Sequence, residues 1–303
     1  MISTEKAHQL IGIYYFVCDA YDSHLKNVCQ RFSPNQNYKF TDQEIMTIYL
    51  FAVSNEQKFK IKQIYDFAKD YLYSWFPALP SYPAFDTRLN NLTEAFKLLS
   101  NLMLTKIQIP PECSLNVSVL DSLPIITCSG KRSGSVAKEL TDKGFCSTKG
   151  MYYFGVKLHS LAFYRPGSLP IPESIMISPA SENDLNVFKY CWSDINNRYF
   201  FGDKIYFDQP YFEQLKNEKK SVMLTPVKAV KNEADVIRKR DKAYNDLFSA
   251  AVSRVRQPIE SSFNWIIEKT DIQRASKVRS TKGLLIHIFG KISAALWMLF
   301  FNP

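Results

Sequence analysis

The stretch VSVLD at residues 117–121 decides the fold class, because it is a short apolar run that ends on a carboxylate. A second apolar run, residues 199–202, is followed by Asp203 in the same way. A carboxylate at the end of a buried strand costs free energy unless something compensates it. Glu260, in a basic and helix-prone stretch, is the third carboxylate of this set. Two strand ends and a helix that converge on one point would hold divalent metal, which in a basic protein indicates chemistry on nucleic acid phosphates.

Apolar and alternating segments after residue 110 predict a sheet. Strands are expected at 116–127 (interrupted at Pro124), 152–164, 174–177, 199–206 and 222–224, helices at 182–195 and 211–220, and a loop at 129–150. The first three strands can form an antiparallel meander, whereas the later alternation of strand and helix requires parallel crossovers. The sequence therefore predicts an α/β domain over residues 111–303, with a mixed five-stranded sheet flanked by helices and a helical C-terminal tail.

Residues 1–110 predict an all-helical N-terminal domain. Thr41 to Glu44 form a capping box that opens a helix, and helices are also expected at 61–75 and 85–104. Pro110 and Pro111 mark the boundary before the first strand. This domain is either a helix-turn-helix reader of DNA bases or a packing module or dimer surface.

Composition limits the class of protein. The chain has 303 residues and a net charge of +9, which favours a polyanionic partner, although a soluble protein can also be basic without one. Its six cysteines form no CxxC pair and no histidine cluster accompanies them, so reduced thiols are expected rather than zinc. The apolar segment at 292–301 is too short to span a bilayer. With no secretory pattern at the start, we expect a cytoplasmic protein without a membrane partner.

Several segments together resemble one known family. They lie at residues 120–122, 153–159, 202–206, 225–228, 254–265 and 273–280. In order and spacing the chain resembles insertion-sequence transposases of the DDE class, which share an RNase H-like core, and most of all the insertion sequence 982 family. The resemblance covers about residue 40 to the end.

The resemblance implies a site and a reaction. Asp121, Asp203 and Glu260 would be the metal-binding catalytic triad, with two Mg²⁺ (or Mn²⁺) ions in each active site. The protein would bind the terminal inverted repeats of its element, cleave at the ends and join the 3′-hydroxyl to target DNA. Since two element ends must be held together, a homodimer on double-stranded DNA is expected. Arg256 matches the arginine that the class has one turn before the glutamate, whereas Ser253 and Ile267 replace its usual tyrosine and lysine.

Basic residues near these motifs are the predicted DNA contacts, mostly to phosphates. They are Lys131, Arg132, Lys157, Lys204, Lys228, Arg256, Lys277 and Arg279. The alternative for the charged helical segment is a solvated face. Lys131 and Arg132 belong to the loop after the first strand, and His159 is expected to be structural or a DNA contact.

Alternatives remain at this point. The same core without strand transfer would be a metal-dependent nuclease, and a chain without cleavage would be an inactive, transposon-derived DNA-binding protein. Asp142, Asp184 and Asp208 are other acids near the motifs, and Asp184 is expected at a helix start. Pro258 implies that the helix carrying Glu260 either kinks or begins there.

Overall fold

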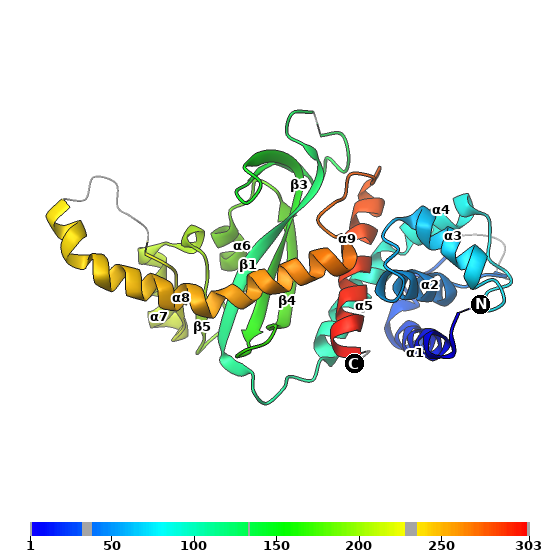
Figure 1. The fold of residues 1–303 in the computed structure, drawn as a ribbon, viewed down its shortest axis with the longest axis horizontal. Coiled ribbons are helices and arrows are strands. Elements are labelled where there is room, and N and C mark those ends of the chain that lie inside the picture. The colour runs from blue at the N-terminus through cyan, green and yellow to red at the C-terminus, as the bar shows by residue number, and fades with distance from the viewer. Residues whose placement is uncertain (1, 32–37, 133, 228–234, 302–303) are drawn as a thin grey trace. The chain divides into compact units, whose positions relative to one another are not determined.

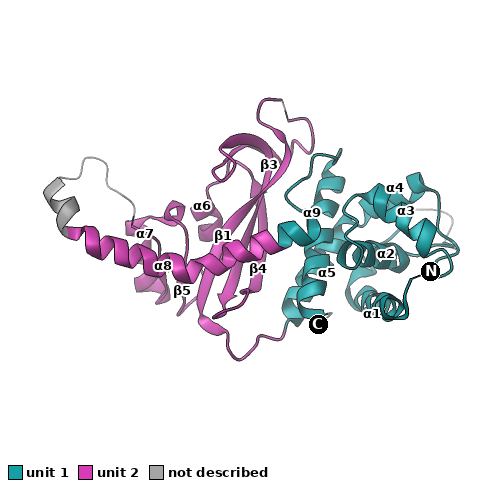
Figure 2. Ribbon diagram, in the orientation of Figure 1, with its two compact units in different colours: residues 1–107, 266–303 teal, residues 108–265 magenta. Residues whose placement is uncertain are grey.

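The computed structural model describes residues 2–31, 38–132, 134–227 and 235–301. The chain divides into two compact units, residues 1–107 with 266–303, and residues 108–265 (Figure 2). The first unit ends close to the predicted boundary at residue 110, and it also contains the C-terminal tail. The assignment of that tail to a catalytic domain stays a prediction.

The first unit is helical (Figure 1). Its helices are α1 (Thr4–Ala20), α2 (Asp42–Ser54), α3 (Ile61–Tyr71), α4 (Tyr82–Asn91), α5 (Thr93–Lys106) and α9 (Thr281–Leu296), with π-helical turns at Tyr21–Leu25 and Trp297–Phe301. The capping box is confirmed, since the Glu44 N–H donates to Thr41 Oγ1 at 3.3 Å and the Thr41 N–H donates to Glu44 Oε2 at 2.6 Å. The single helix predicted for 85–104 is wrong. The backbone leaves the helical region at Leu92 (φ −89°, ψ 17°), which ends α4, and Thr93 begins α5.

The apolar helix α9 packs against α5, α2 and α4 within this unit. Gly290 lets it approach α2 closely, because a Cβ at that position would lie 2.6 Å from the ring of Tyr49. By length and composition the segment Thr281–Phe301 could cross a membrane, yet 67% of its most apolar window is buried. Core helices of soluble proteins pass the same test, so this is weak evidence for a membrane span.

The second unit is built on a six-stranded mixed sheet. Its strands are β1 (Ser114–Ser129), β2 (Asp142–Cys146), β3 (Met151–Tyr164), β4 (Ile171–Pro179), β5 (Tyr199–Phe201) and β6 (Val222–Leu224), in the order β2-β3-β1-β5-β6 with β4 also on β3. β1, β3 and β4 pair antiparallel, whereas β1–β5 and β5–β6 are parallel, as the sequence predicts.

Three local predictions for the sheet are corrected. β2 forms inside the segment expected to be a loop, because Asp142–Cys146 finds a partner in residues 151–155 of β3. β1 continues through Pro124, which is tolerated because β5 pairs only with Val117–Val119 and leaves β1 an edge strand at that position. Asp203 lies outside β5, as the N-cap of a 3₁₀ turn at Lys204–Tyr206.

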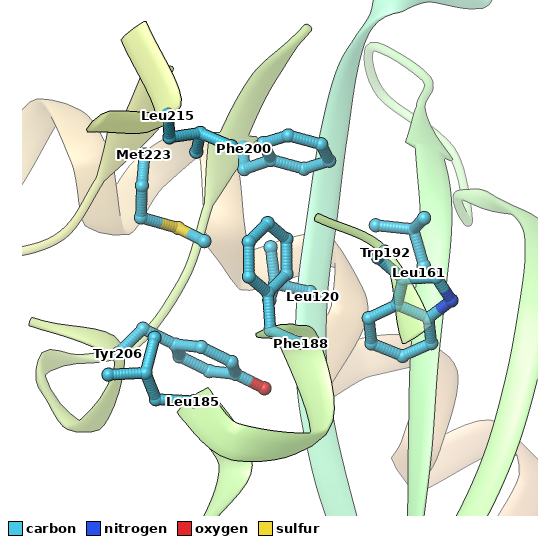
Figure 3. Close-up of a cluster of buried hydrophobic side chains, with 9 residues drawn as sticks. All are labelled: Leu120, Leu161, Leu185, Phe188, Trp192, Phe200, Tyr206, Leu215 and Met223. Atoms are coloured by element: carbon cyan, nitrogen blue, oxygen red, sulfur yellow. The ribbon is translucent and has the colours of Figure 1, made fainter. Parts of the chain in front are cut away.

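The main core of this unit lies on one face of the sheet, under α6 (Asp184–Cys191) and α7 (Gln209–Lys219). Figure 3 shows its nine buried side chains, Leu120, Leu161, Leu185, Phe188, Trp192, Phe200, Tyr206, Leu215 and Met223. Side chains alternate along a strand, so Leu120 faces this core and Asp121 faces the opposite side of the sheet.

The long helix α8 (Asp235–Thr270) supplies the side chains that meet Asp121 on that opposite side. Pro258 lies inside α8, so the helix does not begin there, and Glu260 is an interior residue rather than a first-turn one. The missing N–H of Pro258 removes the helical donor for the carbonyl of Arg254.

Candidate active site

Asp121 and Asp203 follow paired positions of two neighbouring parallel strands at the same distance along the chain. Val119 of β1 pairs with Phe201 of β5, which is the last residue of that strand. Each aspartate follows its member of this pair by two residues. The carboxyl ends of parallel neighbours meet at one edge, where ligands of open α/β sheets bind. Asp121 is therefore not at the end of β1 itself, which continues to Ser129, but at the point where β1 parts from β5.

Arg256 joins the first and third predicted acids. Its Nη1 donates to Asp121 Oδ2 at 2.7 Å, and its Nη2 donates to Glu260 Oε1. Arg256 and Glu260 are one helical turn apart on α8, the spacing at which side chains are neighbours. The Arg256 side chain is only 15% exposed and that of Glu260 is 49% exposed. The structure thus brings together Asp121, Arg256 and Glu260, although Asp121 and Arg256 are 135 residues apart in the sequence.

The charge of Asp203 acts on Asp121, so Asp203 belongs electrostatically to the cluster of Asp121, Arg256 and Glu260. The pKa of the Asp121 carboxyl is raised to about 7, mainly by burial and to a smaller extent by the charges of Asp203 and Asp184. The Arg256 guanidinium and the Ser122 N–H, which donates to Asp121 Oδ1 at 2.8 Å, act in the opposite direction. The Asp203 carboxylate accepts the N–H of Lys204 as a cap. Asp121 thus lies in a partly buried place where further positive charge would favour its ionised form.

A polar network lies on the core side of the same strand. Asp184, in the first turn of α6, accepts the Ser122 hydroxyl at 2.8 Å and the Lys157 ammonium at 2.7 Å. Lys157 also donates to the carbonyl of Glu182 at 2.7 Å. Both charged side chains are largely buried, with 14% of Lys157 and 7% of Asp184 exposed. The pair therefore fixes Ser122, whose backbone N–H holds Asp121.

Sequence reasoning did not find this network. The sequence predicts a helix start at Asp184, which the structure confirms, but it predicts the partner Lys157 as a DNA contact. The alternation of β3 carried a signal, since Lys157 lies on the same face as Leu161, which faces the core. The other two acids have local roles: Asp142 accepts the N–H of Ser181 at 2.7 Å, and Asp208 caps α7.

His159 has a structural role. It is fully buried, and its Nε2 and the Ser178 hydroxyl share a hydrogen bond of 2.8 Å. Burial lowers the pKa of its imidazole to about 4, so the ring is neutral at pH 7. A side chain with no exposed surface does not reach DNA.

The remaining predicted DNA contacts fall in different settings. Lys131, Arg132 and Lys204 of the second unit are exposed, as are Lys277 and Arg279 of the first unit. The Arg279 guanidinium donates to the carbonyls of Ser276 and Val278 at 3.1 and 2.9 Å. Lys228 lies outside the described residues.

A model of the family described as "Transposase DDE domain" matches residues 113–297, which is more than half of the chain. The chain belongs to this family. No curated protein and no solved structure matches it. The mixed sheet with flanking helices and helices at the N-terminus agrees with an RNase H-like α/β fold, as the resemblance implies. The narrower likeness to the insertion sequence 982 family stays a prediction.

DDE transposase domains generally use divalent metal ions, and the residue types present here suit them. Carboxylate oxygens are the hard ligands that Mg²⁺ and Mn²⁺ prefer. Besides burial, the charges of Asp203 and Asp184 raise the pKa of Asp121, and an added cation would offset this repulsion. Within residues that the structure describes, no three acidic, histidine or cysteine side chains are already gathered as a metal shell. The guanidinium of Arg256 contacts two of the three predicted metal ligands, Asp121 and Glu260.

Proposed function

We propose that this DDE-family protein is a DNA transposase that binds the terminal inverted repeats of its own element, cleaves at the ends and joins the freed 3′-hydroxyl to target DNA. One observation carries the proposal. Asp121 and Asp203 follow a paired position of two parallel strands by the same two residues, and Glu260 is linked to Asp121 through Arg256. Family membership supports the reaction class.

In this proposal Asp121, Asp203 and Glu260 hold two Mg²⁺ or Mn²⁺ ions. When bound, such ions neutralise phosphoryl oxygens and activate the attacking oxygen. Arg256 keeps Asp121 and Glu260 on the same side of the sheet and balances their charge. Ser122 orients Asp121 through its N–H, and the buried pair Lys157–Asp184 holds Ser122.

DNA is the proposed partner. The exposed ammonium of Lys204 directly follows Asp203, so it can contact the phosphate next to the one that reacts. Lys131 and Arg132 of the same unit would bind other phosphates of the DNA, and Lys277 and Arg279 of the first unit are further proposed phosphate contacts. A homodimer would hold two element ends together in the cytoplasm, and the element would be of the insertion-sequence type that the motifs resemble.

The experiment uses the full chain, a supercoiled plasmid carrying two copies of the DNA that flanks the gene, and MgCl₂ or MnCl₂. Asp121→Asn, Asp203→Asn and Glu260→Gln are each expected to abolish cleavage while DNA binding persists. Asp194→Asn is the matched control, because Asp194 is 93% exposed and its removal leaves the site intact.

Three results would change the proposal. Cleavage that survives any of the three triad substitutions contradicts the assigned ligands. Cleavage without joined products in a target plasmid supports a nuclease, and specific binding without cleavage supports an inactive DNA-binding protein.

A further inference from the structure

The hairpin of β2 and β3 has two unlike faces. On the inner face, Cys146 and Tyr153 pack with Ala180 in a small buried cluster. Gly144 fits against Ala180, where a Cβ would meet the carbonyl oxygen at 2.5 Å. Because side chains alternate, the neighbouring residues Lys143, Phe145 and Tyr152 lie on the outer face.

The outer face carries large aromatic side chains where polar ones are usual. Phe145 and Tyr152 are direct cross-strand partners, and they remain 53% and 59% exposed. Their ring centroids are 5.1 Å apart in an edge-to-face arrangement. Packing between the two rings does not require that more than half of each side chain stays exposed. Both rings therefore have surface that a ligand can contact.

Basic residues surround this pair. The ammonium of Lys143 lies 5.1 Å from the centre of the Tyr152 ring. The Gly130 N–H donates to the Tyr152 carbonyl at 2.8 Å. A Cβ on Gly130 would lie only 2.6 Å from the Cβ of Tyr152. Gly130 therefore lies against Tyr152, and the exposed residues Lys131 and Arg132 follow this contact point directly in the chain.

The charge of the segment points to an anionic partner. Residues 129–152 contain five basic residues and two acidic ones. One of the two acids, Asp142, already accepts the N–H and hydroxyl of Ser181. Exposed aromatic rings beside lysine and arginine are the side chains that bind single-stranded nucleic acid, where bases stack on rings and cations contact phosphates.

We propose that Phe145 and Tyr152, with Lys131, Arg132 and Lys143 around them, form a stacking platform for unpaired nucleotides of the DNA. This inference rests on the proposed function, which makes DNA the substrate. Tyr153, next to the platform, pairs with Ser129, eight residues along β1 from Asp121. At the strand rise, this separation is roughly 25 Å, a distance equal to about seven base steps of B-form duplex.

The test measures binding by fluorescence anisotropy, with the full chain, EDTA to prevent cleavage, and a labelled single-stranded oligonucleotide of the element end or its duplex. Tyr152→Ala and Phe145→Ala are expected to weaken single-strand binding by about five-fold to a hundred-fold, because stacking contributes on that scale for each base. Duplex binding should change much less. Tyr152→Phe keeps the ring and should retain the affinity, whereas Tyr152→Leu should not.

Two further variants separate stacking from charge and from general surface effects. Tyr190→Ala removes another aromatic residue of this unit, 84% exposed, and should leave both affinities unchanged. The double variant Lys131→Gln with Arg132→Gln should reduce the salt dependence of single-strand binding by one to two counterions, at about 0.7 per phosphate contact.

The results distinguish this inference from the proposed function. If the wild type binds duplex and single strands and the alanine variants bind both equally well, the platform is wrong and the transposase proposal stands. A lower melting temperature with unchanged DNA affinity also overturns it, since the pair then only stabilises the hairpin. Loss of a protein dimer with unchanged DNA affinity assigns the face to a second copy instead. A wild type that binds neither DNA overturns both.

Discussion

The buried pair Lys157–Asp184 allows a quantitative test of how the site is supported. Replacing Lys157 with Met keeps the aliphatic stem and removes the ammonium. Asp184 then remains buried, with the Ser122 hydroxyl as its hydrogen-bond partner from the network. Breaking a buried ion pair by removing one member costs about 3–5 kcal/mol. Because Ser122 still donates to the carboxylate, we expect the lower end, about 3 kcal/mol.

The reverse change costs less. Asp184→Asn removes the negative charge, but the Lys157 ammonium keeps its hydrogen bond of 2.7 Å to the carbonyl of Glu182. We expect a loss of about 2 kcal/mol for this variant, the scale of a hydrogen bond to a charged group. In the double variant no unpaired charge is left buried, so the total loss should be at most about 3 kcal/mol rather than the sum of the two losses. The coupling energy of the pair is therefore at least about 2 kcal/mol.

The assay is urea unfolding at pH 7, followed by tryptophan fluorescence, since Trp192 belongs to the core beneath this network. The control cycle uses Lys219 and Asp194, an ion pair of the same unit in which Asp194 is 93% exposed, and it should give less than about 0.5 kcal/mol. A coupling energy for Lys157 and Asp184 no larger than that of the control would refute the reasoning. The pair would then not hold Ser122 through a buried charge interaction.

Three more changes have defined outcomes. Burial lowers the pKa of Lys291 from 10.5 to about 7. The unfolded chain therefore binds the Lys291 proton more tightly than the folded chain does. The free energy of unfolding should rise between pH 7 and pH 10.5, by at most about 5 kcal/mol. Lys291→Met should remove that part of the rise when urea midpoints at pH 7 and pH 10 are compared, and equal pH profiles for the two proteins would contradict it. Phe188→Ala, a fully buried ring in the core of Figure 3, should cost about 3–5 kcal/mol in urea unfolding, whereas a loss below 1 kcal/mol would mean that the core closes around the gap. Pro258→Ala restores the helical donor for Arg254 and should stabilise the protein by up to about 3 kcal/mol, and a destabilised variant would show that α8 needs the proline.

The elements whose signals are local were predictable. The capping box at Thr41 satisfies its own helix end, so four residues suffice to identify it. Strand and helix alternation after residue 170 predicts parallel strands, because parallel neighbours need a crossover, and the structure pairs β1 with β5 and β5 with β6 in this way. The break at Leu92 was missed because the apolar spacing of α4 and α5 runs on through it. β2 was missed because a short polar and glycine-containing segment becomes a strand only when β3 supplies its hydrogen-bond partners.

The amino-acid sequence alone determined the DDE transposase family and the mixed sheet, and it predicts Asp121, Asp203 and Glu260 as the catalytic acids. Tertiary structure alone decided what those acids contact. Arg256 is a predicted phosphate contact in the sequence, and in the fold it bonds Asp121 and Glu260. Lys157 likewise pairs with Asp184. The physical reason is that a charged side chain forms an ion pair with an oppositely charged side chain that packing brings close to it. Residues far apart in the sequence acquire that proximity only when β1, α6 and α8 pack together.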